Sequence, residues 1–355
     1  MNFKKITSAL LVAGMFSAAF AADGEFGLKG NVQLQATQMD GDSDNNLSSL
    51  WVRANIGGQY KSENLDGLVM LRIFAPQFGN SNVTEATIDK DGKLQTKKTA
   101  QDKILADLYW ANYKWSSDGS NYNLKIGHWK TDWSQSTHFG TYIDRELTAR
   151  GLWMRDYAHN AIEFGWKSGI SQFNAMVATK DNKGNTGYVR FEEDLKFKFP
   201  LELKLAYRSN AIDRINKTAY LTHRFATYLS YNFSPAIRVY GEFASIYTQD
   251  EKIKKTARNY IAPENTYMQP GDARNPFYIG MEFVPHADDA TSLYIEWERI
   301  GDRSFIHNTD KKMDDWAWTI AASRKFGKTR IQLSSYSGDK LDDIGLAFRL
   351  TTTFK

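Results

Sequence analysis

Apolar and polar residues alternate strictly at the end of the chain. Large apolar residues or threonine occupy every second position of the last dozen residues, and the residues between them are small, polar or charged. This set is Ile344, Leu346, Phe348, Leu350, Thr352 and Phe354. A period of two predicts a β-strand with one apolar and one polar face.

The same alternation recurs in about sixteen segments along the chain. The clearest apolar faces are Phe26, Leu28, Val32, Leu34; Leu50, Val52, Ala54, Ile56; Leu201, Leu203, Leu205, Tyr207; and Phe277, Ile279, Met281, Phe283. Two segments, 67–75 and 103–115, carry apolar residues on both faces, so the pattern alone does not orient them.

The connections between these segments alternate in length. Long ones at 76–101, 131–159 and 249–275 are separated by short ones such as 116–120, 168–169 and 234–236. Long outer loops and short periplasmic turns are typical of a membrane barrel. We therefore predict an all-β fold, a transmembrane antiparallel β-barrel of about 16 strands. A soluble β-sandwich or lectin-like domain is the alternative, but it does not explain the alternating lengths.

Composition fits a barrel that is wet inside. Hydrophobic residues make up 42% of the chain and the mean hydropathy is −0.53, because half of every strand must face water. Aromatic residues reach 14%, and Tyr and Trp suit membrane interfaces. There is no cysteine, which excludes disulfides, thiolate nucleophiles and cysteine metal sites.

The N-terminus has the features of a secretion signal. Lys4 and Lys5 precede an apolar run at 6–16, and small residues at Ala19 and Ala21 suit a cleavage site. We predict a signal peptide at 1–21 and a barrel at 22–355 in the outer membrane of a Gram-negative bacterium. A membrane anchor is the alternative, but the run is shorter than a spanning helix needs. Cleavage would lower the net charge from +4 to about +2, too little to indicate a nucleic-acid partner.

Charged residues on the polar faces are predicted to line the lumen, because a charge facing lipid costs about 2–4 kcal/mol at mid-membrane. Arg53, Arg72 and Arg349 should share one arc of wall, since the first and last strands pair to close a barrel. An opposing acidic wall comprises Glu242, Glu282, Glu296 and Glu298, and four further arginines face the lumen: Arg190, Arg208, Arg224 and Arg238. Such an arrangement predicts a field across the pore.

The connection 131–159 mixes apolar and charged residues, unlike an ordinary outer loop. Irregular backbone at membrane depth is tolerated only inside a lumen, so we predict a constriction loop. Its candidate pore residues are Asp144, Arg145, Glu146, Arg150 and Arg155. An exposed loop, or one that contacts a neighbouring subunit, is the alternative.

A family resemblance supports this prediction. The stretch Leu124–Thr131 (LKIGHWKT), then Ile143-Asp144-Arg145 and Arg155-Asp156, is similar to the phosphate-selective porin family of O and P type, and the similarity runs over roughly residues 120–200. The resemblance implies a sixteen-stranded homotrimeric anion channel whose third outer loop folds into the pore. Asp132 departs from the proline usual there, and Lys355 follows the terminal aromatic residue.

Together these features predict a porin, a diffusion channel for small hydrophilic solutes that prefers phosphate or other anions, embedded in lipid and lipopolysaccharide. No cofactor, metal or catalytic residue is expected, because none of the six histidines has a metal-binding spacing. A sugar-selective porin is one alternative, with candidate lumen aromatics Trp51, Trp153, Tyr220, Tyr228, Tyr240 and Tyr294. The other is a non-transport adhesin or hydrolase that uses the loops 76–101 and 249–275.

Overall fold

The computed structural model describes residues 24–40, 49–74, 82–88, 94–100, 104–131, 133, 142–144, 158–179, 187–212, 221–249, 273–285, 290–299, 315–337 and 340–354. Residues 38–40, 49–51, 74, 82–88, 94–100 and 104–105 are described by their backbone alone. The predicted signal peptide and the candidate pore residues Arg145, Glu146, Arg150 and Arg155 lie outside the described residues.

The described chain is almost entirely strand. The strands are β1 (Glu25–Asp40), β2 (Ser49–Lys61), β3 (Leu65–Phe74), β4 (Asn82–Ile88), β5 (Leu94–Ala100), β6 (Ile104–Ser117), β7 (Ser120–Lys130), β8 (Ala158–Ser168), β9 (Ser171–Thr179), β10 (Gly187–Lys196), β11 (Leu201–Ser209), β12 (Thr222–Ser234), β13 (Ile237–Thr248), β14 (Ala273–Arg274), β15 (Phe277–Phe283), β16 (Thr291–Arg299), β17 (Trp316–Phe326), β18 (Thr329–Ser337) and β19 (Ile344–Phe354). Within these ranges, no helix has the length and apolarity needed to cross a membrane.

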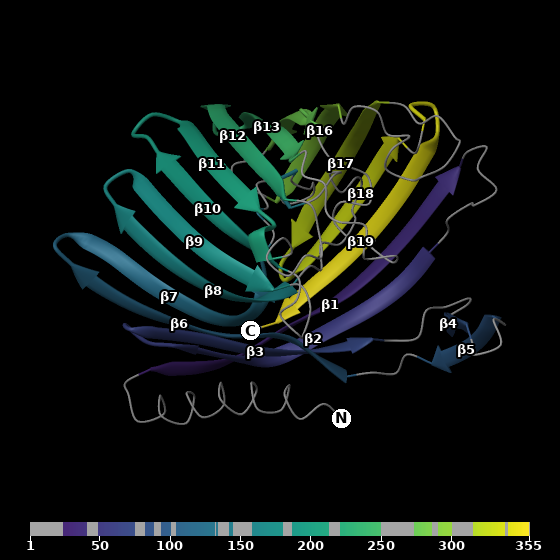
Figure 1. Ribbon diagram of the computed structural model, residues 1–355. Helices are drawn as coiled ribbons and strands as arrows, with labels where there is room; N and C mark the ends of the chain where they lie inside the picture. Colours follow the sequence, from purple (N-terminus) through teal and green to yellow (C-terminus); the bar gives the residue numbers. More distant parts are fainter. Residues whose placement is uncertain are drawn as a thin grey trace.

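The strands close into a barrel (Figure 1). Each long strand pairs antiparallel with its neighbours, and β1 pairs with both β2 and β19, where Gln33 lies opposite Arg53 and Gln35 opposite Arg349. The sheet has 17 strands, one of which is the two-residue β14. The predicted sixteen-stranded antiparallel barrel is therefore confirmed. Strands β4 and β5 form a separate two-stranded sheet in the connection 76–101, which the sequence pattern did not predict.

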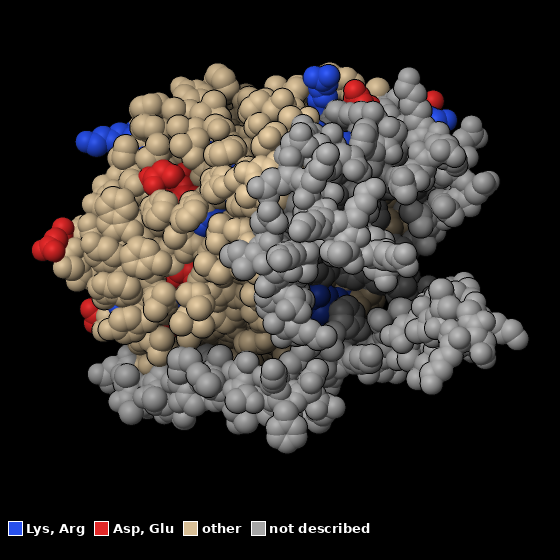
Figure 2. All heavy atoms as spheres, in the orientation of Figure 1, with Lys and Arg blue, Asp and Glu red and all other residues tan. Residues whose placement is uncertain are grey.

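The two faces of the wall are inverted relative to a soluble protein. On β16, Leu293, Ile295 and Trp297 are each about 45% exposed, whereas the alternate residues Glu296 and Glu298 are buried. Figure 2 shows the result on one side of the barrel, a surface on which charged side chains are few and mostly near the edges. An exposed apolar belt of this kind is stable only in contact with lipid.

The two segments that the pattern left unoriented are strands with apolar residues inside the barrel. On β3, Leu68 and Met70 share the inward face of Arg72 and are buried. A β-bulge between Met70 and Leu71 shifts the pairing with β6 at this point. Since both faces are apolar here, a period of two could not appear in the sequence.

Short turns connect the strands at one end of the barrel. Between β6 and β7, Asp118 and Gly119 both have positive φ angles, of 52° and 74°. Positive φ at both central residues is the geometry of a two-residue hairpin turn, and it explains why Asp-Gly occupies this position.

Candidate functional site

The connection 131–159 begins and ends at one hydrogen-bonded cluster. Thr131 directly follows β7 and His159 lies near the start of β8; the Thr131 Oγ1 and His159 Nδ1 atoms are 2.6 Å apart. The hydroxyl of Tyr188, on the inward face of β10, donates to Thr131 Oγ1 at 2.8 Å. These contacts fix the two ends of the connection beside the inward wall.

Three consecutive residues of this connection, Tyr142, Ile143 and Asp144, pack against the inward wall. Tyr142 and Ile143 are 0% exposed. They belong to a buried cluster with Ala206 on β11 and Ala226 on β12, whose side chains face inward. These described residues of the connection therefore contact inward-facing residues of the barrel wall.

A row of three arginines holds this segment. Arg190, Arg208 and Arg224 lie directly opposite one another on β10, β11 and β12. Arg190 Nη1 donates to Asp144 Oδ1 at 2.9 Å. Three further bonds reach main-chain oxygens: Arg208 donates to Ile143 O at 3.2 Å and Asp144 O at 3.0 Å, and Arg224 donates to Tyr142 O at 3.0 Å.

Such a row is unfavourable without compensation, because like charges directly opposite on a sheet repel. Asp144 supplies part of the compensation and Glu192, which pairs with Arg190, supplies more. Burial raises the pKa of Asp144, but the charges of Arg190 and Arg208 outweigh it and hold the pKa below its ordinary value. Asp144 is therefore a carboxylate at neutral pH.

Tyr142 is held on its other side by two glutamates. Its backbone N–H donates to Glu242 Oε1 at 2.8 Å, and its hydroxyl donates to Glu298 Oε2 at 3.1 Å. Burial, followed by the charges of Glu298 and Glu242, raises the pKa of Tyr142 well above its ordinary value, so the hydroxyl keeps its proton. We call this surface of β10–β16 the loop wall, with Arg190, Arg208, Arg224, Glu242 and Glu298.

The predicted arginine arc lies on adjoining strands elsewhere in the barrel. Arg53 on β2 donates to Gln33 Oε1 at 3.0 Å, and Arg349 Nε on β19 donates to Gln35 Oε1 at 2.9 Å. We call this surface of β19, β1 and β2 the glutamine wall. Arg72, on the next strand, forms an ion pair with Asp107. Arg349 therefore lies on β19, Arg53 on β2 and Arg72 on β3, with β1 between β19 and β2, and all three are buried.

The four predicted wall glutamates also lie together, on β13, β15 and β16. Glu282 forms an ion pair with Arg238 at 2.6 Å. Glu242 and Glu298 accept hydrogen bonds from Tyr142 of the loop. They therefore hold the loop in place, in addition to contributing negative charge to the electric field across the lumen.

Sequence reasoning placed Arg190, Arg208 and Arg224 in the lumen but did not include them in the site. The missed signal is their register. They occupy equivalent heights on three consecutive strands, which could be found by pairing the strands from the short turns.

Of the candidate sugar-stacking aromatics, the structure describes the side chains of Tyr228, Tyr240 and Tyr294. All three are buried, and Tyr228 and Tyr240 pack in the cluster under Tyr142. The side chains of Trp51, Trp153 and Tyr220 lie outside the described part. Across the described ranges, no group of three or more His, Asp or Glu side chains could hold a metal ion.

Comparison with known proteins identifies the architecture. No protein-family model and no curated sequence matches the chain. A loop-deletion mutant of OmpT, an outer membrane protein of Vibrio cholerae, is similar at 10% identity and a TM-score of 0.57 over 94% of this chain and 100% of that one. Two mutants of the Rhodopseudomonas blastica porin match at 12% and 14% identity with TM-scores of 0.50 and 0.51, each over 93% of this chain and 100% of the porin.

The chain is an outer-membrane β-barrel. At these identities the likeness establishes the fold, which is that of the outer-membrane barrels of Gram-negative bacteria, and the exposed apolar belt indicates that the wall contacts lipid. The similar structures include porins, which supports a porin-like architecture. They say nothing about selectivity for phosphate.

Proposed function

We propose that this barrel is a passive diffusion channel for small hydrophilic solutes, narrowed by the connection 131–159. The observation that carries the proposal is the attachment of Tyr142–Asp144 to the loop wall, because a segment fixed there reduces the open cross-section. Polar inward faces would keep the remaining lumen wet.

The proposal includes a preference for anions. Arg53, Arg72 and Arg349 keep their charge at every accessible pH, and planar guanidinium groups suit carboxylate and phosphate oxygens. The resemblance of residues 120–200 to phosphate-selective porins favours the same preference. A homotrimer is part of this proposal, and it predicts migration at about three times the monomer mass on unboiled gels.

Planar-bilayer recording of the purified protein tests the function. A diffusion channel gives stepwise increases in current as single barrels insert. A folded protein that inserts into the bilayer without conducting would contradict the proposal and favour the non-transport alternative. Deletion of 76–101 or 249–275 would then show whether either loop carries adhesion or hydrolysis.

A further inference from the structure

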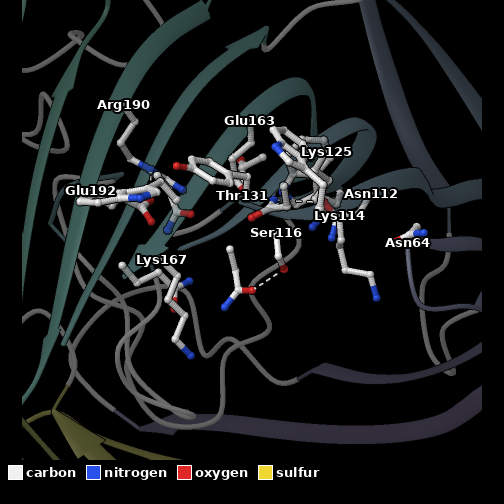
Figure 3. A pocket seen from close by; sticks show the side chains of 18 of the residues that line it. Asn64, Asn112, Lys114, Ser116, Lys125, Thr131, Glu163, Lys167, Arg190 and Glu192 are labelled. Atoms are coloured by element: carbon white, nitrogen blue, oxygen red, sulfur yellow. Dashed lines mark hydrogen bonds and ion pairs between the residues drawn. The ribbon is translucent and has the colours of Figure 1, made fainter. Parts of the chain in front are cut away.

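A cavity of about 680 Å³ opens on the inward face of β6–β10, on the short-turn side of Thr131 and Trp133 (Figure 3). Its volume lies within the range of small-molecule sites, roughly 300–1,000 Å³. None of the arginines of the glutamine wall lines it, and the loop contributes only its first residues. The cavity adjoins the loop wall at Arg190 and the loop end at Thr131, which both line it, and extends from there toward the short turns.

Two asparagines that line this cavity, Asn123 on β7 and Asn174 on β9, lie on either side of Gly165 on β8. A Cβ atom added at Gly165 would meet Asn123 Oδ1 at 2.1 Å and Asn174 Oδ1 at 3.0 Å, so the two amides converge above the glycine. Side-chain amides both donate and accept hydrogen bonds, which suits hydroxyl groups.

Lysines surround this amide pair. Lys114 lies opposite Asn123, and Lys125 and Lys167 occupy the positions on either side of that row. Two of the three are engaged: Lys114 forms an ion pair with Asp66 at 3.0 Å, and Lys125 lies opposite Glu163 between the rings of Trp110 and Trp129. Lys167, in contrast, has no ion pair among the described residues and lines the cavity.

The carboxylates limit the charge that fits here. Glu163 and Glu192 line the same cavity, and Figure 3 shows Glu192 beside Arg190, across the cavity from Lys114 and Lys125. They would repel a second negative charge, whereas Lys167 offers one cation to a single carboxylate. Lys130 also lines the cavity but has an interaction of its own, so the wall combines the charge of Lys167 with hydroxyl-binding amides.

We propose that this cavity binds a small monoanion that carries several hydroxyl groups, of the sugar-acid class, as a solute site inside the proposed channel. The carboxylate pairs with Lys167, and the hydroxyl groups bind the amides of Asn123 and Asn174. This inference rests on the proposed diffusion channel and specifies a class of solute for it.

Four probes separate the chemistry in bilayer recordings at constant ionic strength and pH 7. Gluconate carries charge and hydroxyl groups, acetate only charge, glucose only hydroxyl groups, and inorganic phosphate a different anion. We expect gluconate to block half of the ion current at a concentration of about 1–10 mM. Acetate and glucose should have half-blocking concentrations about tenfold higher or more. Equal or stronger block by phosphate or acetate would overturn the sugar-acid assignment.

Two variants and one control locate the site. Lys167→Gln should raise the half-blocking gluconate concentration about tenfold. Gly165→Ala should displace the amides and weaken gluconate block while leaving acetate unchanged. Lys204→Gln is the matched control, because Lys204 also faces the lumen, pairs with Asp194 and Glu202, and does not line the cavity. Equal effects of Lys167→Gln and Lys204→Gln would overturn the site in favour of general lumen charge.

Failure of the site and failure of the channel give different results. A conducting channel that gluconate does not block overturns this inference and leaves the proposed function standing. If the folded protein does not conduct, calorimetric titration of the detergent-solubilised chain with gluconate still tests the cavity. Saturable binding that Lys167→Gln weakens would support the site, and absence of binding would overturn it.

Discussion

The loop wall and the glutamine wall use arginine in two different ways. On the loop wall, Arg190, Arg208 and Arg224 bind Asp144 and backbone oxygens from a distant part of the chain. On the glutamine wall, Arg53 and Arg349 are held by amide oxygens of the adjacent strand β1. We infer that the first set positions the loop, whereas the second set is oriented by the wall itself and acts on the passing solute.

Among the variants that distinguish the two walls, replacement of Asp144 should change conductance and stability the most. Asp144→Asn leaves Arg190 and Arg208 with a weakened partner, and loss of one member of a buried ion pair costs about 3–5 kcal/mol. We expect a detached loop, a lower free energy of unfolding and a larger or less stable single-channel conductance.

The matched control is Asp118→Asn in an exposed turn, where asparagine tolerates the positive φ angle. It should leave conductance and stability unchanged. Wild-type conductance in a folded Asp144→Asn variant would show that this contact does not position the loop.

Replacement of Arg53, Arg72 and Arg349 together by Gln should change ion preference without releasing the loop. The zero-current potential in a salt gradient should move towards cation preference, because the net charge of the chain is only +4 and any preference must come from local placement. If the triple variant conducts with an unchanged zero-current potential, other residues must determine ion preference. Arg145, Arg150 and Arg155 would then be the next residues to test.

A smaller effect is expected at Tyr142. Tyr142→Phe removes the hydroxyl that donates to Glu298 and should lower the free energy of unfolding by about 1 kcal/mol. Tyr278→Phe is the control, because the buried hydroxyl of Tyr278 has no hydrogen-bond partner among the described residues. Denaturant unfolding in lipid vesicles would compare them, and equal losses would mean that the Glu298 contact contributes nothing specific.

The smallest effect is expected from pH. Because the pKa of Asp144 is lowered, its stabilising contribution is complete above its unfolded value of about 3.9 and is lost only as pH falls through the lower folded value. Conductance should therefore match at pH 7 and pH 5 and change only below about pH 4. The arginines give no titration in this range, so ion preference should also stay constant between about pH 5 and 9. A conductance transition near pH 6 would contradict this expectation.

The difference between the walls also explains what the sequence could predict. A period of two reveals which residues of a strand face inward, so Arg53, Arg349, Glu242 and Glu298 could be placed in the lumen without a structure. The wall partners of Tyr142–Asp144 could not be found this way, because the loop has no period and its hydrogen bonds to the loop wall join residues 46 to 156 positions apart in sequence. The pattern also failed on β3, where Leu68 and Met70 make the inward face apolar.

Cross-linking gives the most direct test of the loop's position. The chain has no native cysteine, so pairs can be introduced without background. We would combine Ile143→Cys with Ala206→Cys, which lie in one buried cluster, and compare them with Ile143→Cys plus Ala347→Cys, in which the second residue lies on the inward face of β19. A short thiol cross-linker applied to the protein in membranes should join only the first pair, seen as altered migration on a denaturing gel. Equal cross-linking of both pairs, or of neither, would contradict a loop anchored to the loop wall.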